Sequence, residues 1–172
     1  STHYGEGNRL MLQSIAEKGK FDSVDFLNRF HAFFGSPLYT GYLDHATRQV
    51  LENLQLHMNP AGADDDQEAV ASRLSPLVML YHNDPQLLAI VEEATAITQN
   101  NPIAIAYMQC NAEILVDLLQ GMDLRIAFEK HLDNPICGPR IQTALDLLES
   151  DMDFIESTKQ LGLACPLDQG FA

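Results

Sequence analysis

The sequence is poor in basic residues. Its 172 residues include 10 Lys and Arg against 24 Asp and Glu, which leaves a formal net charge of -14 at pH 7. A surface of this sign repels the phosphate backbone of nucleic acids and anionic lipid headgroups. We therefore expect no nucleic-acid partner and no membrane partner, and we interpret the acidic excess mainly as a solubility feature.

Cysteine is also scarce. The three residues Cys110, Cys137 and Cys165 form no Cys-x-x-Cys motif, and an odd number argues against a disulfide framework. Cys110 lies in an apolar helical run and is most simply a small buried residue. This pattern fits a reducing compartment, so we expect a cytoplasmic location.

Several other signals are missing from the sequence. No uninterrupted apolar run approaches the roughly 18 residues of a membrane span, and no signal peptide opens the chain. Trp, the Gly-x-Ser-x-Gly elbow, the Gly-rich phosphate loop and the His-Glu-x-x-His motif are absent. Because the sequence begins at Ser1 and not at Met, one interpretation is an internal portion of a longer chain.

Helical periodicity and capping residues are abundant. Gly19, Asp22, Asp84-Pro85 and Asn101-Pro102 predict helix ends, and no strand alternation interrupts the helices. The predicted helices lie at about 6–18, 22–34, 44–54, 64–81, 84–97, 101–121, 122–131, 139–148 and 151–161. We therefore predict an all-α fold, with residues 1–172 forming a single compact helical domain.

Asp64, Asp65 and Asp66 are the most concentrated charges in the chain. Carboxylates at a helix start cap free amides and interact well with the helix dipole. They are also the ligands that Mg²⁺ and Ca²⁺ prefer. Successive helical side chains point about 100° apart, so three adjacent aspartates do not converge on one ion. We favour the capping interpretation.

Arg73 interrupts an otherwise apolar helical segment. One interpretation pairs it with the upstream aspartates, because a charged group in that setting needs a partner. The other places it at the surface, with its stem covering apolar area. The six histidines are scattered along the sequence, and we interpret them, His45 beside Asp44 included, as structural or solvated.

Several segments together resemble the ADP-ribosylglycohydrolase family. That family opens a helix with Thr-Asp-Asp-Thr, and an ungapped count back from Phe21 places this motif on Thr2-His3-Tyr4-Gly5. The family's Met-Arg-x-x-Pro-Leu segment is similar to Ser72-Arg73-Leu74-Ser75-Pro76-Leu77. Its Ala-x-x-x-Thr-His segment resembles Ala94 to Gln99, with Gln99 in place of the His. The resemblance is clearest up to about Gly121.

The resemblance implies an orthogonal helical bundle and, in active members, two Mg²⁺ ions held by carboxylates. Here His3 and Tyr4 stand where the family has paired aspartates, and neither imidazole nor phenol is a good Mg²⁺ ligand. His3 suits Zn²⁺ or no metal. The second family motif, Asp-x-Asp-Thr, has no match, since Asp151-Met152-Asp153 keeps only the spacing. This pattern is closest to the J-type crystallin and selenoprotein J branch.

Three functional hypotheses follow from these features. The first is hydrolysis of an N- or O-glycosidic bond to ADP-ribose or a related small molecule, with Mg²⁺ as the family's cofactor. The second is a non-catalytic, crystallin-like structural or ligand-binding protein, and the third is a helical partner-binding module. We assign no metal ligand and no catalytic residue. The ligand-binding candidates are Thr2, His3, Tyr4, Glu6, Asp64, Asp65, Asp66 and Arg73.

Overall fold

The computed structural model describes residues 2–171, and within that range it contains helices and two isolated β-bridges but no β-strand. The predicted all-α fold is confirmed. The helices are α1 (His3–Lys18), α2 (Ser23–Phe34), α3 (His45–Gln55), the 3₁₀ helix η1 (Glu68–Arg73), α4 (Leu74–Tyr81), α5 (Leu87–Ala96), α6 (Pro102–Leu119), α7 (Leu124–Glu129), α8 (Gly138–Glu149), α9 (Phe154–Leu161) and α10 (Leu167–Gly170).

The helix ends follow the capping chemistry of the sequence. Thr2 accepts a hydrogen bond from the amide of Gly5, so α1 begins at His3, earlier than predicted. Gly19 ends α1 with φ 70°, a left-handed conformation that favours glycine. Asp22 caps α2 and Asn101 caps α6, as predicted. Capping residues thus set the length of the helices that surround the core.

Two predicted helix starts are wrong. Asp84 accepts a hydrogen bond from the amide of Gln86 within a turn, and α5 begins only at Leu87. The predicted helix from Asp64 through Tyr81 is an extended segment, then η1, then α4. Asp65 bonds the amide of Gln67 in the turn before η1, but its other carboxylate oxygen is engaged elsewhere, so the aspartate run does not start an α-helix.

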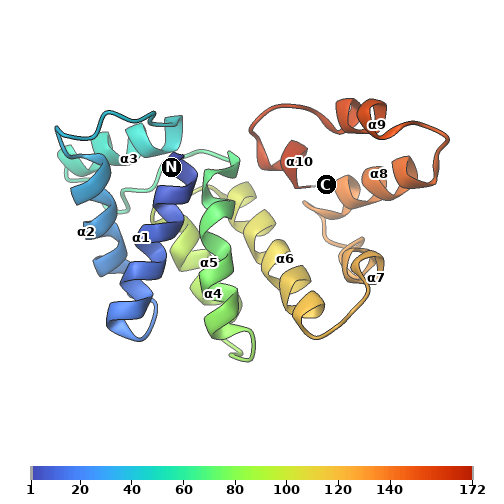
Figure 1. Cartoon of the computed structure of the whole chain (residues 1–172), viewed down its shortest axis with the longest axis horizontal. Coiled ribbons are helices and arrows are strands. Elements are labelled where there is room, and N and C mark those ends of the chain that lie inside the picture. The colour runs from blue at the N-terminus through green and yellow to red at the C-terminus, as the bar shows by residue number, and fades with distance from the viewer. Residues whose placement is uncertain (1, 172) are drawn as a thin grey trace.

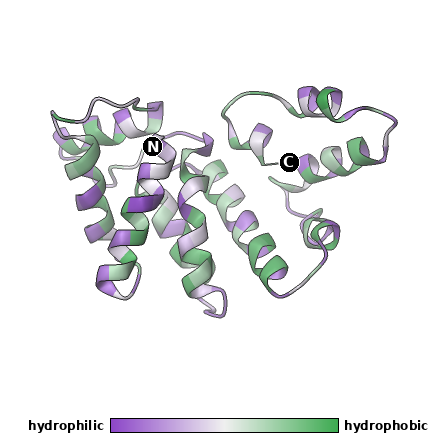
Figure 2. Cartoon of the chain, in the orientation of Figure 1, coloured by the Kyte–Doolittle hydropathy of each residue, from purple (hydrophilic) through white to green (hydrophobic). Residues whose placement is uncertain are grey.

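The core consists of two apolar clusters that meet at Tyr81. The smaller one joins α1, α2 and α3 to α4 and α5; its buried members are Leu10, Met11, Phe26, Phe30, Phe34, Ala46, Val50, Ala63, Leu77 and Ala94. The larger one centres on α6 and extends to α8 and α10. Apolar positions alternate with polar ones along the outer helices (Figure 2).

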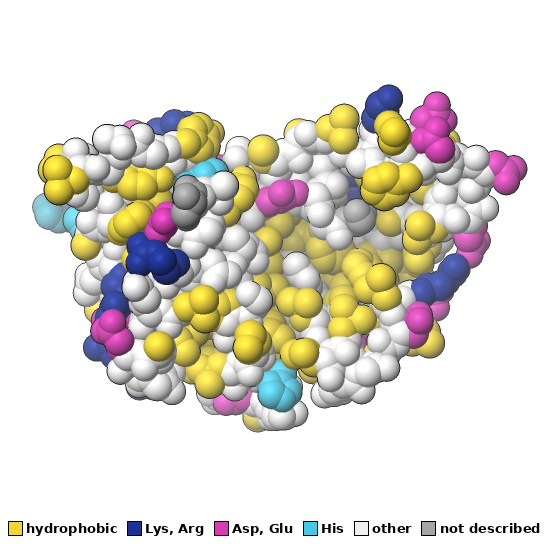
Figure 3. Space-filling view, in the orientation of Figure 1, with side chains coloured by type: hydrophobic (Ala, Val, Ile, Leu, Met, Phe, Trp, Pro, Cys, Tyr) yellow, Lys and Arg dark blue, Asp and Glu magenta, His cyan; other side chains and the backbone are white. Residues whose placement is uncertain are grey.

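The molecule has two parts of different character. Helices α1 to α6 pack side by side, whereas the C-terminal arm, α7 to α10, wraps around the far side of α6 (Figure 1). Apolar side chains gather where this face is hollowed between the two parts (Figure 3). None of the residues of α9 is buried. Helix α9 is therefore far less enclosed than the neighbouring helices of the arm, which contribute buried residues such as Ile141 and Leu167 to the core.

Helix α6 is the one helix within residues 2–171 that is long and apolar enough, by length and composition, to cross a membrane. It contains polar residues, Asn111 and Asp117 among them. It packs against α4, α5 and α7 and supplies seven buried residues. This packing indicates the central helix of a core, so the length criterion alone is weak evidence for a membrane span.

Candidate functional site

The site lies where the first residues of α1 and α3 meet the segments 63–73 and 98–99. We call this group of side chains the polar head; it consists of His3, Asp44, His45, Asp65, Arg73, Thr98 and Gln99. The segment 63–67 is fixed there by backbone contacts. The amide of Ala63 donates to the carbonyl of Thr98 at 2.9 Å. A Cβ on Gly62 would lie 2.0 Å from the carbonyl oxygen of Ala96, so only glycine allows this approach.

His3 and Asp44 form the first imidazole–carboxylate pair of the polar head. His3 Nε2 lies 3.3 Å from Asp44 Oδ2, close enough for an ion pair but not in hydrogen-bond geometry, and both side chains are largely buried. The other oxygen of Asp44 accepts the amide of Thr47 at 2.7 Å and so caps α3. The His3 ring also packs on Tyr4, with 4.0 Å between ring centroids. The Asp44 carboxylate therefore faces an imidazole on one side and a helix start on the other.

His45 and Asp65 form the second pair. The distance from His45 Nδ1 to Asp65 Oδ2 is 2.7 Å, and a carboxylate only accepts, so Nδ1 carries the hydrogen. Asp65 Oδ1 accepts the amide of Gln67 at 2.9 Å. The Asp65 side chain is 4% exposed while that of His45 is 59% exposed. A buried carboxylate thus orients an imidazole whose Nε2 edge faces outward.

Gln99 is fully buried and ties the segment 65–67 to the end of α5. Its Nε2 donates to the carbonyl of Asp65 at 3.1 Å and to that of Gln67 at 2.7 Å. Its Oε1 has no hydrogen-bond partner among the described residues. Gln99 occupies the position where the resembling family has His, and here it acts as a backbone clamp.

Arg73 is buried beneath these pairs. Its guanidinium donates to the hydroxyl of Thr98 and lies 6.0 Å and 5.9 Å from the ring centroids of Phe26 and Phe30. Burial lowers the pKa of Arg73 to about 10, and the charge of Asp44 opposes that shift. Arg73 therefore stays charged at neutral pH. Both interpretations of Arg73 were wrong, because it is neither at the surface nor paired with the aspartates of 64–66.

A model of the ADP-ribosylglycohydrolase family matches residues 2–167. The chain belongs to this family. The match runs well past Gly121, where the resemblance in the sequence becomes harder to follow. The chain is also similar to Crystallin J1A of Tripedalia cystophora, at 25% identity over 184 aligned residues. This alignment covers 98% of the present chain and 56% of the crystallin.

A solved structure of an ADP-ribosylglycohydrolase-related protein complex shares the fold, with a TM-score of 0.66 at 20% identity. The structural alignment covers 99% of the present chain and 67% of the chain in that solved structure. This similarity supports the orthogonal bundle of the ADP-ribosylglycohydrolase type. The present chain spans about half the length of the crystallin relative.

The other candidate residues of the ADP-ribosylglycohydrolase motif have separate partners. Thr2 caps α1, and Glu6 pairs with Arg9 at 2.7 Å. Tyr4 lies between His3 and a pocket of about 240 Å³, and burial raises its pKa. That pocket is lined by Tyr4, Glu68, Ala71, Ser72, Asn111, Leu167, Gly170 and Phe171. Tyr4 is thus the candidate residue that lines this cavity.

The three aspartates of the acidic run do not converge. Asp64 accepts a hydrogen bond from the side chain of Asn101 at 2.7 Å, at the surface. Asp65 belongs to the polar head, and the carbonyl of Asp66 accepts the amide of Leu167 at 2.8 Å. Within residues 2–171, no group of three or more His, Cys, Asp or Glu side chains is placed to hold a metal ion.

The donor set of the polar head does not fit the dinuclear magnesium centre that the family implies. Asp44 and Asp65 are the two buried carboxylates of the polar head, and each accepts a backbone amide. Asp65 also accepts a hydrogen bond from His45, whereas Asp44 Oδ2 faces His3 without a hydrogen bond among the described residues. Arg73 adds a permanent positive charge beside Asp44. A second cation at that position is electrostatically unfavourable.

Little in the sequence indicates this arrangement. Asp44 and His45 carry the two pairs, yet adjacent Asp and His residues are common at helix starts and carry no specific signal. Their partners are distant in sequence, His3 on one side and Asp65 on the other. The usable hint was the capping position of Asp44, since it fixes where the next side chain points.

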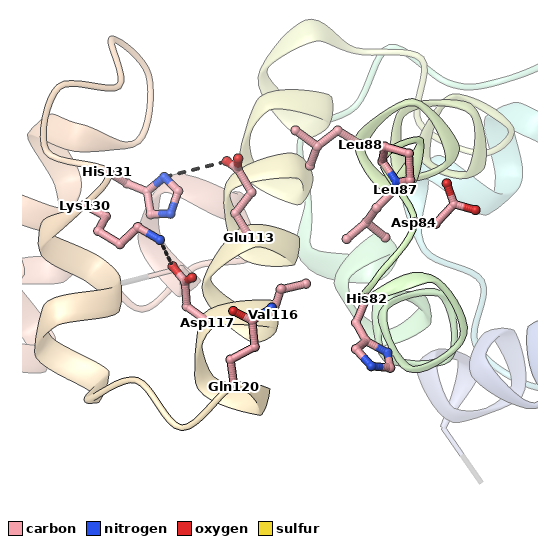
Figure 4. A pocket seen from close by; sticks show the side chains of 11 residues that line it. His82, Asp84, Leu87, Leu88, Glu113, Val116, Asp117, Gln120, Lys130 and His131 are labelled. Atoms are coloured by element: carbon pink, nitrogen blue, oxygen red, sulfur yellow. Dashed lines mark hydrogen bonds and ion pairs between the residues drawn. The ribbon is translucent and has the colours of Figure 1, made fainter.

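A larger groove of about 560 Å³ lies at the opposite end of α6 (Figure 4). Across it, α7 is attached to α6 by Lys130, whose Nζ lies 2.5 Å from Asp117, and by His131, 3.8 Å from Glu113. His82 and Asp84 come from the opposite wall (Figure 4). The carboxylates of Asp117 and Glu113 on α6 therefore pair with two residues that directly follow α7, and these contacts link the arm to α6.

Proposed function

We propose that the chain is a non-catalytic, crystallin-like member of the ADP-ribosylglycohydrolase family, kept for its fold and for binding a small ligand without magnesium. The observation that carries this proposal is the pairing of His3 with Asp44 at the head of α1. A hard cation needs several free oxygen donors, and this carboxylate offers only one, Oδ2, with an imidazole nitrogen 3.3 Å away. The crystallin name of the relative from Tripedalia cystophora supports the same interpretation.

ADP-ribose or a related small molecule is the ligand that we propose. The pocket beside Tyr4 offers an aromatic ring, Phe171, together with Glu68, Ser72 and Asn111 as polar groups. Burial raises the pKa of Glu68. The family to which the chain belongs supports this choice of ligand. We also propose that residues 1–172 form one domain and that the protein is cytoplasmic.

Calorimetric titration tests this function. Titrating the protein with MgCl₂ gives no binding heat if the carboxylates are engaged as described, whereas ADP-ribose gives a saturable signal without Mg²⁺. The double variant His3→Asp, Tyr4→Asp restores two acids at the head of α1 and is expected to gain Mg²⁺ binding. Magnesium binding by the unaltered protein, lost on Asp44→Asn, contradicts the proposal.

A second function, metal-independent hydrolysis of an N- or O-glycosidic bond to ADP-ribose, is favoured by one observation. His45 is an exposed imidazole oriented by a buried carboxylate, an arrangement that accepts a proton from water. If this function operates, His45→Ala and Asp65→Asn both abolish release of ADP-ribose in EDTA, whereas His57→Ala has no effect. Full activity in His45→Ala excludes it.

A further inference from the structure

The groove at the far end of α6 is separate from the polar head. Its volume of about 560 Å³ lies in the range of small-ligand pockets. One wall is formed by the turn between α4 and α5 and by the start of α5, and the other by α6 and the residues that follow α7 (Figure 4). Neither Tyr4 nor any residue of the polar head lines it. A ligand held in this groove is therefore independent of the function proposed for the head.

Two carboxylates of the groove have no basic partner. Three acids line it, and one of them, Asp117, is matched by the ammonium of Lys130 at 2.5 Å. Asp84 accepts the amide of Gln86 in its own turn, and within residues 2–171 no Lys or Arg forms an ion pair with Asp84 or Glu113. The Glu113 side chain is 47% exposed. With histidine counted as neutral, the groove is therefore negative and favours a cation over an anion.

His131 places an imidazole without hydrogen bonds beside one of these carboxylates. Its Nδ1 lies 3.8 Å from Glu113 Oε2, which is too long for a direct hydrogen bond. Its Nε2 is buried and has no hydrogen-bond partner within residues 2–171, although the side chain is only 11% exposed. Polar side chains that are buried to this extent are normally hydrogen-bonded. An ammonium group spans the gap, because its three N–H donors reach Glu113 Oε2 and His131 Nδ1 together.

Between the two carboxylates the groove is apolar. Val116 follows Glu113 by one turn of α6, so both side chains lie on the same face of the helix. Leu87 and Leu88, at the start of α5, form the facing wall and separate Glu113 from Asp84 in Figure 4. A metal ion does not suit this arrangement, since the part of the chain from 2 to 171 places no set of three His, Cys, Asp or Glu side chains to hold one. The lining combines a negative charge on each wall with an aliphatic strip between them.

We propose that this groove binds an aliphatic diamine or polyamine. One ammonium lies between Glu113 and His131, the methylene chain covers Val116 and Leu88, and the second ammonium reaches Asp84. The methylene chain gains free energy by leaving water, and each ammonium gains from a carboxylate that lacks a cation. A monoamine of the same length offers only part of this match, and a neutral diol offers still less.

Methyl NMR of the unaltered protein tests the proposal and locates the site. At physiological ionic strength, putrescine and spermidine are expected to shift the methyl signals of Leu87, Leu88 and Val116 along a saturable curve. Butylamine carries one ammonium on the same four-carbon chain and should bind about threefold to fivefold more weakly than putrescine. Butanediol should produce no saturable shift.

Three variants separate this groove from the general attraction of an acidic protein for cations. Glu113→Gln and Asp84→Asn each remove one groove carboxylate and should weaken putrescine binding about threefold to fivefold. Glu52→Gln removes one exposed charge from α3, at the other end of the molecule, and should leave the affinity unchanged (Figure 1).

Several outcomes overturn the proposal. Equal weakening of putrescine binding in all three variants does so, and so do equal affinities for putrescine and butylamine. The same holds when putrescine shifts no methyl signal, or only signals outside the groove. Because the titration of the unaltered protein needs no substitution, a variant that folds poorly leaves the test intact.

Discussion

The polar head and the C-terminal arm use charge in opposite ways. In the head, Asp44, Asp65 and Arg73 are buried; Asp65 and Arg73 hydrogen-bond to distant segments, and Asp44 caps α3 and faces His3. In the arm, Arg125 bridges Glu129 and Glu149 at the surface. Buried charges are costly to leave without partners, whereas exposed pairs contribute little. The same acidic composition therefore stabilises one region through specific contacts and mainly solubilises the other.

The largest expected difference between the regions is in apolar packing. Phe30 is buried in the smaller core cluster, whereas Phe154 on α9 is 84% exposed. Phe30→Ala should lower the free energy of unfolding by about 3–5 kcal/mol, because it removes a ring from a close-packed core. Phe154→Ala should change it by less than about 0.5 kcal/mol. Urea denaturation measures both, and equal losses would show that α9 is as enclosed as the core.

Removal of Arg73 tests the buried charge of the head. Arg73→Ala leaves a cavity and takes away the cation beside Asp44, so we expect a loss of about 3 kcal/mol in unfolding free energy. Arg73→Lys keeps the charge but not the planar donor to Thr98, and should lose less. A loss below about 1 kcal/mol for Arg73→Ala would mean that the site relaxes around the missing side chain.

The next largest loss of unfolding free energy is expected for Gln99, whose side-chain amide clamps the backbone of segment 65–67. Gln99→Ala leaves the carbonyls of Asp65 and Gln67 without their donor, which should cost about 2 kcal/mol. The matched control in the arm is Gln142→Ala, which removes an exposed bond to Asp146. That control should stay within about 0.5 kcal/mol of the unaltered protein by thermal or urea unfolding. Similar losses in the two variants would contradict a special role for Gln99.

The smallest expected effect is on the way in which folding stability depends on pH. Hydrogen bonds from Arg29 and Ser14 lower the pKa of Asp25 to about 2. The unfolded chain thus binds this proton at higher pH than the folded chain. The stabilisation is complete above the ordinary carboxyl range and disappears as the pH falls toward 2.

Substitution of Asp25 checks that direction. Asp25→Asn should lower the urea midpoint at pH 6, and the difference from the unaltered protein should shrink below pH 3. Asp146→Asn on α8 is the exposed control and should show no such convergence. A difference for Asp25→Asn that stays constant from pH 6 to pH 2.5 would show that the ion pair with Arg29 does not carry it.

The fold was predictable because its signals are local. Gly19, Asp22 and Asn101 end or begin helices through bonds to residues within four positions, and such bonds are visible in a sequence. The helix predicted to start at Asp64 does not form, because a residue distant in the sequence binds Asp65. The carboxylate of Asp65 bonds His45, and no local rule contains that partner.

The site was predictable only in part for the same reason. Thr2, His3 and Tyr4 were singled out by the family resemblance, and the structure places His3 in the polar head. Arg73 was recognised as an anomaly, but its partner Thr98 belongs to the end of another helix. Three adjacent aspartates look alike in the sequence, yet only Asp65 is buried. Which one turns inward depends on the path of the segment after Gly62.

That path is set by main-chain contacts and not by the chemical nature of the side chains. At Gly62 the chain touches the last turn of α5 so closely that no side chain fits, and Ala63 is bonded to Thr98 directly afterwards. A backbone segment held in this way allows the side chains attached to it to change. The side chains of the polar head can therefore differ in chemistry while the path of the backbone stays the same.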